Sequence, residues 1–173
     1  MQQASRTESG DKGPLRICFL DFDGVVHLEP VYRSPKRGIY IGTPGHTLFE
    51  WAPILEQLLE PHPDVKIVLS TSWVRIRSFN FAKSQLSPAL QERVIGATFH
   101  NRFMREDEFV CLPRGVQIAN DVFRRGPQSW FAIDDDYLGW PEWCRDNLIR
   151  TDGARGLSDP KIQEAIRIML KRF

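Results

Sequence analysis

The amino-acid sequence predicts an α/β fold, a three-layer Rossmann-like arrangement in which helices cover both faces of one parallel sheet. Short apolar runs at residues 15–20, 65–70 and 130–133 each end in polar residues, and segments with helical periodicity lie between them. Continuous apolar runs of this length are typical of strands buried on both faces, and their alternation with helices implies parallel pairing. The length of 173 residues suits a single domain with its own core.

The first elements expected along the chain are a leader, a strand and a hairpin. Residues 1–13 are polar and aperiodic, which predicts a disordered leader before one ordered domain at 14–173. The strand at 15–20 follows directly. Residues 37–48 then contain two short β-prone runs around Gly42-Thr43-Pro44-Gly45, which predicts a hairpin flap with its turn at that tetrapeptide.

The remaining predicted elements are helices around the second and third strands. The spacing of apolar residues predicts helices at 49–60, 74–86 and 116–123, and a last amphipathic helix that starts near Pro160, after Asp159 as its N-cap. Ligands bind to such sheets at the carboxyl ends of the strands. The polar residues that follow the three strands are therefore expected to meet at one rim.

Composition excludes several classes of protein. Lys plus Arg is 23 and Asp plus Glu is 22, a net charge of +1, and 42% of residues are hydrophobic, which argues against intrinsic disorder and against a dedicated duplex-DNA binder. No apolar run approaches the length of roughly 20 residues that crosses a membrane, and the N-terminus lacks the apolar core of a secretory signal. We expect a cytoplasmic protein that does not contact membranes. The sequence carries no indication of oligomeric state.

Cysteine and histidine suggest neither disulfides nor a zinc site. The three cysteines are widely spaced with no C-x-x-C pair, and the four histidines lack the spacing of metal ligands. We interpret the cysteines as reduced cytosolic thiols, and we assign no histidine a role unless the fold brings it to the site. The residues are Cys18, Cys111, Cys144, His27, His46, His62 and His100.

Two carboxylates follow the first strand. Because side chains alternate in extended chain, Asp21 and Asp23 should point the same way with Phe22 toward the core, and Gly24 permits a sharp turn. Two carboxylates in one small space repel each other unless a proton or a divalent cation lies between them, and an all-oxygen site suits Mg²⁺. The structural alternative is an Asx-type turn that closes the strand.

Three more polar groups are expected at the same rim. Asp134-Asp135-Asp136 ends the third strand, where a cation would relieve the repulsion, although a solvated acidic turn also explains it. Ser70-Thr71-Ser72 precedes a helix, a position that accepts phosphate or simply caps the helix. Arg114 precedes the helix that leads into the third strand, where it is either a fixed cation of the rim or a solvated surface residue.

The order of these four groups resembles the haloacid dehalogenase (HAD) superfamily of phosphohydrolases. The first motif matches Leu20-Asp21-Phe22-Asp23-Gly24-Val25-Val26, the second matches Ile67-Val68-Leu69-Ser70, and the fourth matches Ile133-Asp134-Asp135, while Arg114 stands where the superfamily has Lys or Arg. The pattern looks most like the small capless branch that includes phosphatase domains of RNA-repair proteins. The resemblance spans residues 15 to about 172, and outside the motifs it rests on element order.

The resemblance implies a Mg²⁺-dependent phosphomonoester hydrolase with an aspartyl-phosphate intermediate. Asp21 would be the nucleophile, and Asp23 would protonate the leaving oxygen and then activate water. The implied metal ligands are Asp21, Asp23 and Asp135, with Asp134 in support; Asp23 would contribute its backbone carbonyl, and the choice of Asp135 over Asp134 rests on position alone. The implied phosphate-binding residues are Ser70, Thr71 and Arg114, with Arg124 and Arg125 as alternative cations.

The intervals between the motifs leave no room for a cap domain, so the site should be open. An open site admits large substrates such as a phosphorylated nucleic-acid end or a phosphoprotein, and small phosphomonoesters as well. Residues 71–125 contain nine Lys or Arg against five acids, with aromatic residues interleaved. This composition suits nucleic-acid binding, and it also suits an ordinary mixed-charge helical surface.

Two functions of other classes also fit the sequence. One is a receiver-type phospho-acceptor signalling domain, which also places acids, a hydroxyl and a basic residue at strand ends. Such a domain should carry its acceptor aspartate alone on a central strand. The other is a non-catalytic nucleic-acid-binding module.

Overall fold

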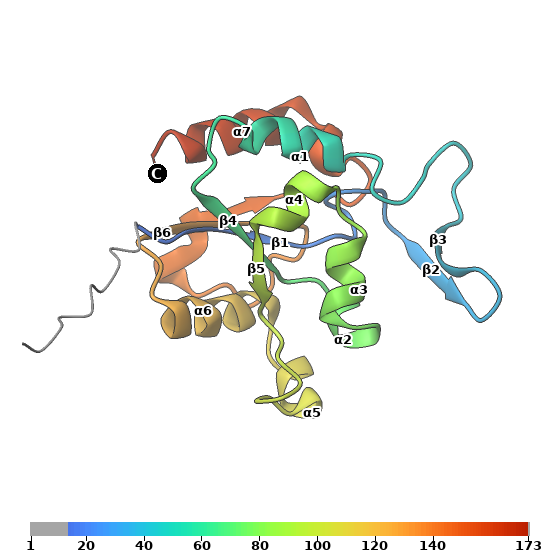
Figure 1. The fold of residues 1–173 in the computed structure, drawn as a ribbon, viewed down its shortest axis with the longest axis horizontal. Coiled ribbons are helices and arrows are strands. Elements are labelled where there is room, and N and C mark those ends of the chain that lie inside the picture. The colour runs from blue at the N-terminus through green and yellow to red at the C-terminus, as the bar shows by residue number, and fades with distance from the viewer. Residues whose placement is uncertain (1–13, 173) are drawn as a thin grey trace, which may run out of the picture.

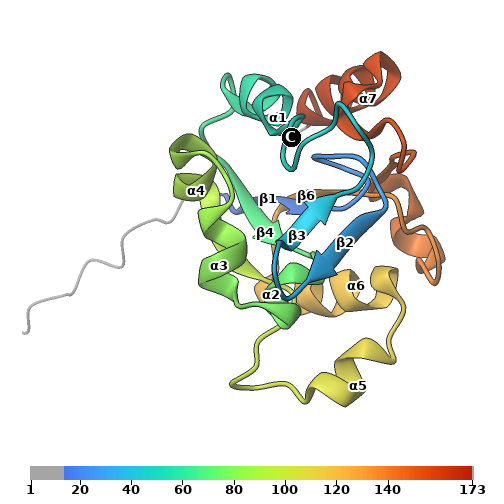
Figure 2. The ribbon, with the colours of Figure 1, turned by 90° about the vertical axis from the view of Figure 1, so that its right-hand side faces the viewer.

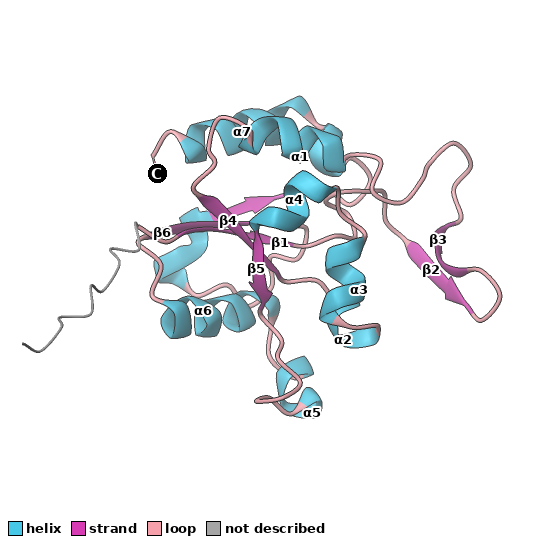
Figure 3. Ribbon diagram, in the orientation of Figure 1, coloured by secondary structure: helices cyan, strands magenta, loops and turns pink. Residues whose placement is uncertain are grey.

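The computed structural model describes residues 14–172 and contains a five-stranded parallel sheet with helices on both faces (Figures 1 and 3). The predicted α/β class is confirmed. The order across the sheet is β5-β4-β1-β6-β7, so the strand that carries the first motif is central. Its strands are β1 (Arg16–Leu20), β4 (Val65–Leu69), β5 (Val94–Ala97), β6 (Ser129–Asp134) and β7 (Leu148–Arg150). The predicted leader at 1–13 lies outside the described residues.

The register of the sheet brings three motif positions together. Leu20 of β1 pairs with Leu69 of β4 on one side and with Ile133 of β6 on the other. Two backbone hydrogen bonds extend this register by one residue: the Asp21 N–H donates to the Ile133 carbonyl (3.2 Å) and the Ser70 N–H to the Leu20 carbonyl (2.9 Å). Three strands therefore end side by side.

The two faces of β1 feed two separate hydrophobic cores. Cys18 and Leu20 pack into the larger core, which α1 (Ala52–Leu59) and α7 (Pro160–Leu170) cover on one side of the sheet. Ile17 and Phe19 pack into the smaller core, which lies between the sheet and α6 (Arg114–Arg125). All four side chains are fully buried. This explains why the strand is a continuous apolar run.

The single helix predicted at 74–86 is wrong, because the structure has two short helices there. They are α2 (Trp73–Ile76) and α3 (Phe79–Ser84). Ser78 is extended (φ 175°, ψ 164°), and its hydroxyl accepts a hydrogen bond from the Phe81 N–H at 3.0 Å as the N-cap of α3. A serine that caps a new helix ends the old one, since its side chain competes with the helical backbone.

The hairpin is present, but its predicted turn is wrong. Its strands are β2 (Val31–Ser34) and β3 (Gly38–Ile41), so the turn lies at residues 35–37 rather than at the Gly42 tetrapeptide. Ser34 Oγ accepts a hydrogen bond from the Arg37 N–H (3.0 Å), and Gly38 takes a positive φ of 69°. Proline in the turn and glycine after it suit a tight reversal. The hairpin projects beyond the carboxyl ends of the central strands (Figures 1 and 2).

Shorter elements complete the chain. No helix within residues 14–172 is long and apolar enough to span a bilayer. The elements not yet given are α4 (Pro88–Arg93), α5 (Glu106–Val110) and the 3₁₀ turns η1 (Glu142–Asn147) and η2 (Gly156–Ser158).

Candidate active site

Three buried polar side chains stand where the central strands end. Asp21 follows β1, Ser70 follows β4 and Asp134 is the last residue of β6. Their exposed fractions are 5%, 3% and 0%. Carboxylate oxygens of Asp21, Asp134 and Asp135 all lie within 4.8 Å of one another. The sheet register thus gathers acids that are more than one hundred positions apart in the sequence into one cluster, which we call the acid cluster.

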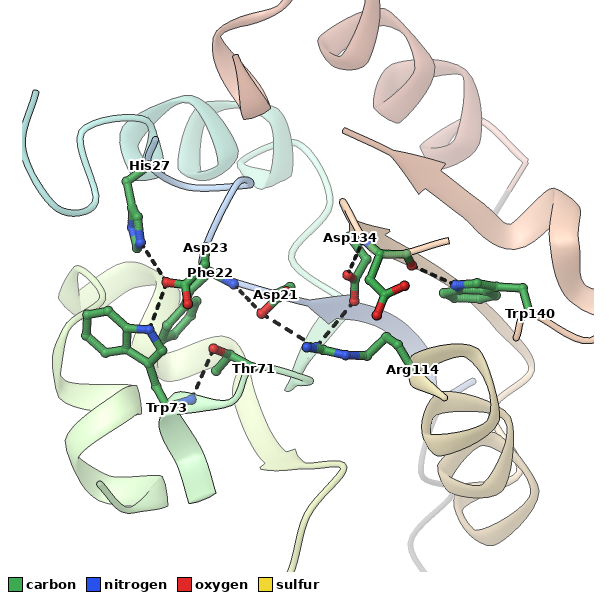
Figure 4. A network of polar contacts seen from close by, with 10 residues as sticks. Asp21, Phe22, Asp23, His27, Thr71, Trp73, Arg114, Asp134 and Trp140 are labelled. Atoms are coloured by element: carbon green, nitrogen blue, oxygen red, sulfur yellow. Dashed lines mark hydrogen bonds and ion pairs between the residues drawn. The ribbon is translucent and has the colours of Figure 1, made fainter. Parts of the chain in front are cut away.

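Arg114 brings the predicted positive charge to the acid cluster. It is the first residue of α6, and its Nη1 lies 3.5 Å from Asp21 Oδ1 and 3.4 Å from Asp134 Oδ2 (Figure 4). Gly115 permits this placement, because a Cβ there would lie 2.5 Å from the Trp140 Cα. The alternative cations Arg124 and Arg125 lie at the other end of α6, where both pair with Asp121.

Burial and mutual repulsion perturb the acids. Burial, opposed by Arg114 and reinforced by Asp23, raises the pKa of Asp21 to about 6. Burial and the contact with Glu29 raise the pKa of Asp135 to about 7. Burial and Asp21 hold the pKa of Asp134 well above its usual range. Desolvation disfavours the charged form of these carboxylates, so a cation bound beside them would stabilise that form.

Three atoms at the site are buried without a hydrogen-bond partner among the described residues. They are Ser70 Oγ, Arg114 Nη1 and Asp134 Oδ2. Buried polar groups normally have hydrogen-bond partners, so three such atoms close together indicate a ligand-binding site. A cavity of about 210 Å³ adjoins them and is lined in part by Thr71, Arg75 and Thr98.

This donor set fits Mg²⁺ and a phosphate. Three carboxylates offer the hard oxygen ligands that Mg²⁺ prefers, and Asp134 Oδ2 has no hydrogen-bond partner among the described residues. The Ser70 hydroxyl and the Arg114 guanidinium are donors suited to phosphoryl oxygens. The Thr71 hydroxyl, also predicted to bind phosphate, accepts a hydrogen bond from the Trp73 N–H at 3.3 Å.

The Asp23 side chain is not one of the three carboxylates of the acid cluster, although the alternation of side chains predicts that it shares one small space with Asp21. The metal contact expected of its backbone carbonyl stays a prediction. Its Oδ1 accepts hydrogen bonds from Trp73 Nε1 (2.8 Å) and from His27 Nε2 (3.0 Å). The reason is that the extended chain ends at Asp21: the Val25 and Val26 N–H groups both donate to the Phe22 carbonyl, which forms a helical turn. The alternation of side chains stops where that turn begins.

Gly24 gives Asp135 room to approach. Its φ is +70°, and a Cβ at this position would lie 2.8 Å from Asp135 Oδ2. The Thr151 hydroxyl donates to the Gly24 carbonyl at 2.9 Å and holds the turn in place. The glycine of the first motif is therefore required both for the turn and for the acid cluster.

Sequence reasoning missed three residues of the site: Glu29, which contacts Asp135, and the two residues that bind Asp23, Trp73 and His27. The separation of four positions between Asp23 and His27 is the one signal available for His27, and it is meaningful only once a helical turn after β1 is known. Trp73 directly follows the Ser70-Thr71-Ser72 motif, but its partner is 50 positions away.

Comparison with known proteins agrees with this geometry. No curated protein and no solved structure matches the chain. A family model described as the HAD domain in Swiss Army Knife RNA repair proteins matches residues 17–162, a range that includes every site residue named above. HAD domains are generally hydrolases, mainly phosphatases, that use Mg²⁺. This match excludes the receiver class, and the chain belongs to the HAD domain family of Swiss Army Knife RNA repair proteins.

Proposed function

We propose that this protein is a Mg²⁺-dependent phosphomonoester hydrolase that forms an aspartyl-phosphate on Asp21 and acts on the phosphorylated end of an RNA. The observation that carries the proposal is the set of buried atoms around Asp21 that have no hydrogen-bond partner among the described residues, which are Ser70 Oγ, Arg114 Nη1 and Asp134 Oδ2. Two are donors and one is an anionic acceptor. Together they suit a phosphoryl group and a cation held side by side.

Asp21 is oriented to attack with one oxygen. Its Oδ1 accepts the Phe22 N–H at 2.8 Å and faces Arg114, which leaves Oδ2 without a protein partner among the described residues. In the reaction, Oδ2 forms a bond to phosphorus while the bond from phosphorus to the leaving oxygen breaks. Ser70 and Arg114 stabilise the charge on the phosphoryl oxygens, a fixed electrostatic contribution.

Asp23 completes both halves of the reaction. It gives its proton to the leaving oxygen of the substrate, and the resulting carboxylate then takes a proton from the water that hydrolyses the aspartyl-phosphate. Asp21 and inorganic phosphate are released and Asp23 is again protonated, so atoms and charge balance. Mg²⁺, held by the acid cluster of Asp21, Asp134 and Asp135, would neutralise the repulsion between phosphate and carboxylates.

An RNA end is the substrate that the surroundings favour. The family is described by its occurrence in RNA repair proteins. The hairpin beyond the site carries Arg33, Lys36 and Arg37 and no acid, and these cations have no ion-pair partner among the described residues. The Arg37 Cζ lies 5.5 Å from the centroid of the Tyr40 ring. Tyr32, whose ring neighbours that of Tyr40, is 48% exposed. Cations with exposed aromatic rings suit single-stranded nucleic acid.

The segment 71–125 supports RNA binding less well than its composition suggested. Arg75 pairs with Glu106 at 3.0 Å, and Arg105 pairs with Asp107 at 2.7 Å. Arg93 instead donates to three backbone carbonyls near β4. Much of the positive charge counted in the segment is thus already neutralised or used within the fold.

The experiment is a phosphate-release assay with and without Mg²⁺. The substrates are RNA oligonucleotides with a 3′- or a 5′-phosphate, a phosphopeptide, a sugar phosphate and an aryl phosphate. We expect Mg²⁺-dependent release that is fastest from one of the two RNA ends, and that slows when Lys36 and Arg37 are both changed to Gln. Faster release from the phosphopeptide or the sugar phosphate would contradict RNA as the substrate, and it would leave the proposed phosphatase activity intact.

A trapping experiment tests the nucleophile. Borohydride reduces an aspartyl-phosphate to homoserine, so a quenched reaction should carry homoserine at position 21 and at no other aspartate. The matched variant Asp23→Asn should still accumulate the intermediate from an aryl phosphate, yet turn over at least about a hundredfold more slowly. RNA binding without any hydrolysis, by a folded protein with Mg²⁺, would instead identify a non-catalytic binding module.

A further inference from the structure

We propose that Trp73 and His27 are positioning residues that fix which oxygen of Asp23 faces the substrate. Both donate hydrogen bonds to Asp23 Oδ1, at 2.8 Å and 3.0 Å, and they leave Oδ2 as the oxygen available to the leaving group (Figure 4). The inference rests on the proposed function, since it assigns the geometry of the proton donor in that reaction. Neither residue would touch the reacting atoms.

The tautomer of His27 follows from a third contact. The Phe49 backbone N–H points at His27 Nδ1 at 3.3 Å, so Nδ1 accepts and carries no hydrogen. The ring hydrogen is then on Nε2, where it is donated to Asp23 Oδ1. Phe49 itself has a positive φ of 60°, which is uncommon for a residue with a side chain. The backbone at Phe49 thus presents an N–H that selects the donor form of the ring.

Trp73 has a single donor, and it is aimed at the same oxygen. Its side chain is 2% exposed, and its indole N–H has no use in the apolar core other than the bond to Asp23. Trp73 is the first residue of α2 and follows the loop that carries Ser70. Through this bond the end of β4 is tied to the turn that follows β1.

Packed aromatic rings prevent the two donors from moving. The Trp73 ring lies edge-on to Phe22 at 5.7 Å and to Phe49 at 5.3 Å, and the His27 ring lies edge-on to Phe49 at 5.0 Å. His27 is fully buried, whereas 28% of the Asp23 side chain is exposed. A carboxyl group at the edge of the site is therefore held by rigid groups in the core, as preorganised catalysis requires.

Two N–H donors on one carboxylate oxygen have a chemical consequence. Oδ1 has its lone pairs directed at Trp73 and His27, so a proton cannot be carried there without breaking one of these bonds. The hydrogen transferred to the leaving oxygen must be on Oδ2, which has no partner among the described residues. If the hydrogen bonds from Trp73 and His27 are removed, the Asp23 carboxyl group can rotate, and its proton no longer points at the leaving oxygen.

Leaving-group dependence separates this role from a structural one. A good leaving group such as dinitrophenolate needs no proton as it departs, whereas an alkyl alcohol does. The value of kcat/KM reports the steps up to cleavage of the bond to the leaving group. We expect Trp73→Phe to lower kcat/KM for an alkyl phosphate by about tenfold, which is part of the loss expected when the acid itself is removed. The value of kcat/KM for dinitrophenyl phosphate should stay within about twofold of the wild-type value.

Matched variants sharpen the test. His27→Leu should behave like Trp73→Phe, while His27→Gln, whose amide can both accept from Phe49 and donate to Asp23, should restore most of the activity on the alkyl phosphate. Trp143→Phe is the control, because Trp143 is 55% exposed and lies on η1. In an Asp23→Ala background, Trp73→Phe should add less than a twofold further loss, since both act through one group.

A readout without turnover tests the contacts directly. In ¹⁵N spectra His27 should have a protonated Nε2 and a bare Nδ1, and the Trp73 indole N–H signal should move upfield in Asp23→Ala. A bare Nε2, an unmoved indole signal, or equal losses for both leaving groups would overturn the positioning role while hydrolysis by Asp21 stands. A folded wild-type chain with no activity on any phosphomonoester would overturn the proposed function, and this role with it.

Discussion

The helix α6 has a buried acid paired with arginine at each of its ends, and the two groups differ in how completely they are hydrogen-bonded. At its C-terminal end Asp121 is 2% exposed, with Oδ1 bonded to Arg124 and Oδ2 bonded to Arg125 Nε at 2.5 Å. At its N-terminal end Arg114 stands 3.4 Å or more from both of its acids. We call the C-terminal group, which consists of Asp121, Arg124 and Arg125, the Asp121 cluster.

The difference distinguishes a structural ion pair from a binding site. Both oxygens of Asp121 have donors, and Arg125 Nη2 also donates to the Ala97 carbonyl at 3.3 Å, which ties α6 to β5. In the acid cluster, by contrast, Asp134 Oδ2 and Arg114 Nη1 have no hydrogen-bond partner among residues 14–172. Buried charge with complete hydrogen bonding holds a fold together, whereas incomplete bonding at buried charges is tolerated where a ligand completes it.

The largest expected effect is at Asp21. Asp21→Asn removes the proposed nucleophile, so we expect phosphate release to fall by at least about 10⁴-fold, as when other covalent nucleophiles are removed. The melting temperature without Mg²⁺ at pH 7 should stay the same or rise, because a buried charge is lost. The contrast between the two ends of α6 is wrong if Asp21→Asn keeps its activity, or if its melting temperature falls as far as that of a variant of the Asp121 cluster.

Asp121→Asn should give the opposite result. It leaves Arg125 buried without its counter-charge, and breaking such a buried pair costs about 3 to 5 kcal/mol of unfolding free energy. The value of kcat/KM of the folded protein should not change. Urea unfolding measures the first quantity and an assay at low temperature the second. Loss of activity without loss of stability would place Asp121 in the site and remove the contrast.

The pH dependence of stability is the smallest effect, and it reports on the acid cluster. The pKa of Asp21 is about 6 in the folded protein against an ordinary 3.8, so the folded state binds more protons between these values. With a chelator present, stability should fall as pH rises from about 4 to about 7, by about 3 kcal/mol from Asp21 alone. Urea titrations across this range measure the slope.

Mg²⁺ and the Asp21→Asn variant provide the controls for this slope. Mg²⁺ competes with the protons, so the stabilisation it provides should grow as pH rises. Asp21→Asn should flatten the slope measured in chelator. A wild-type stability that rises with pH in chelator would mean that the acids of the cluster are not held above their ordinary pKa values.

Much of the fold was predictable from short stretches of sequence. The strands that become β1, β4 and β6 are apolar because both their faces are buried, and each ends at the polar residue that the pattern indicates. The short strands β5 and β7 were not predicted, since runs of only three or four residues carry too weak a pattern. The helix break at Ser78 and the hairpin turn depended on local hydrogen bonds that apolar periodicity does not report.

The sequence by itself determined the chemical identity of the site: an acid after β1, hydroxyls after β4, a cation at the start of α6 and acids after β6. These follow from where strands end, which is a local property of burial. Only the tertiary structure decided the partners. It placed the Asp23 carboxylate against Trp73 and His27, because side-chain contacts depend on how a turn and a helix 50 positions apart pack together.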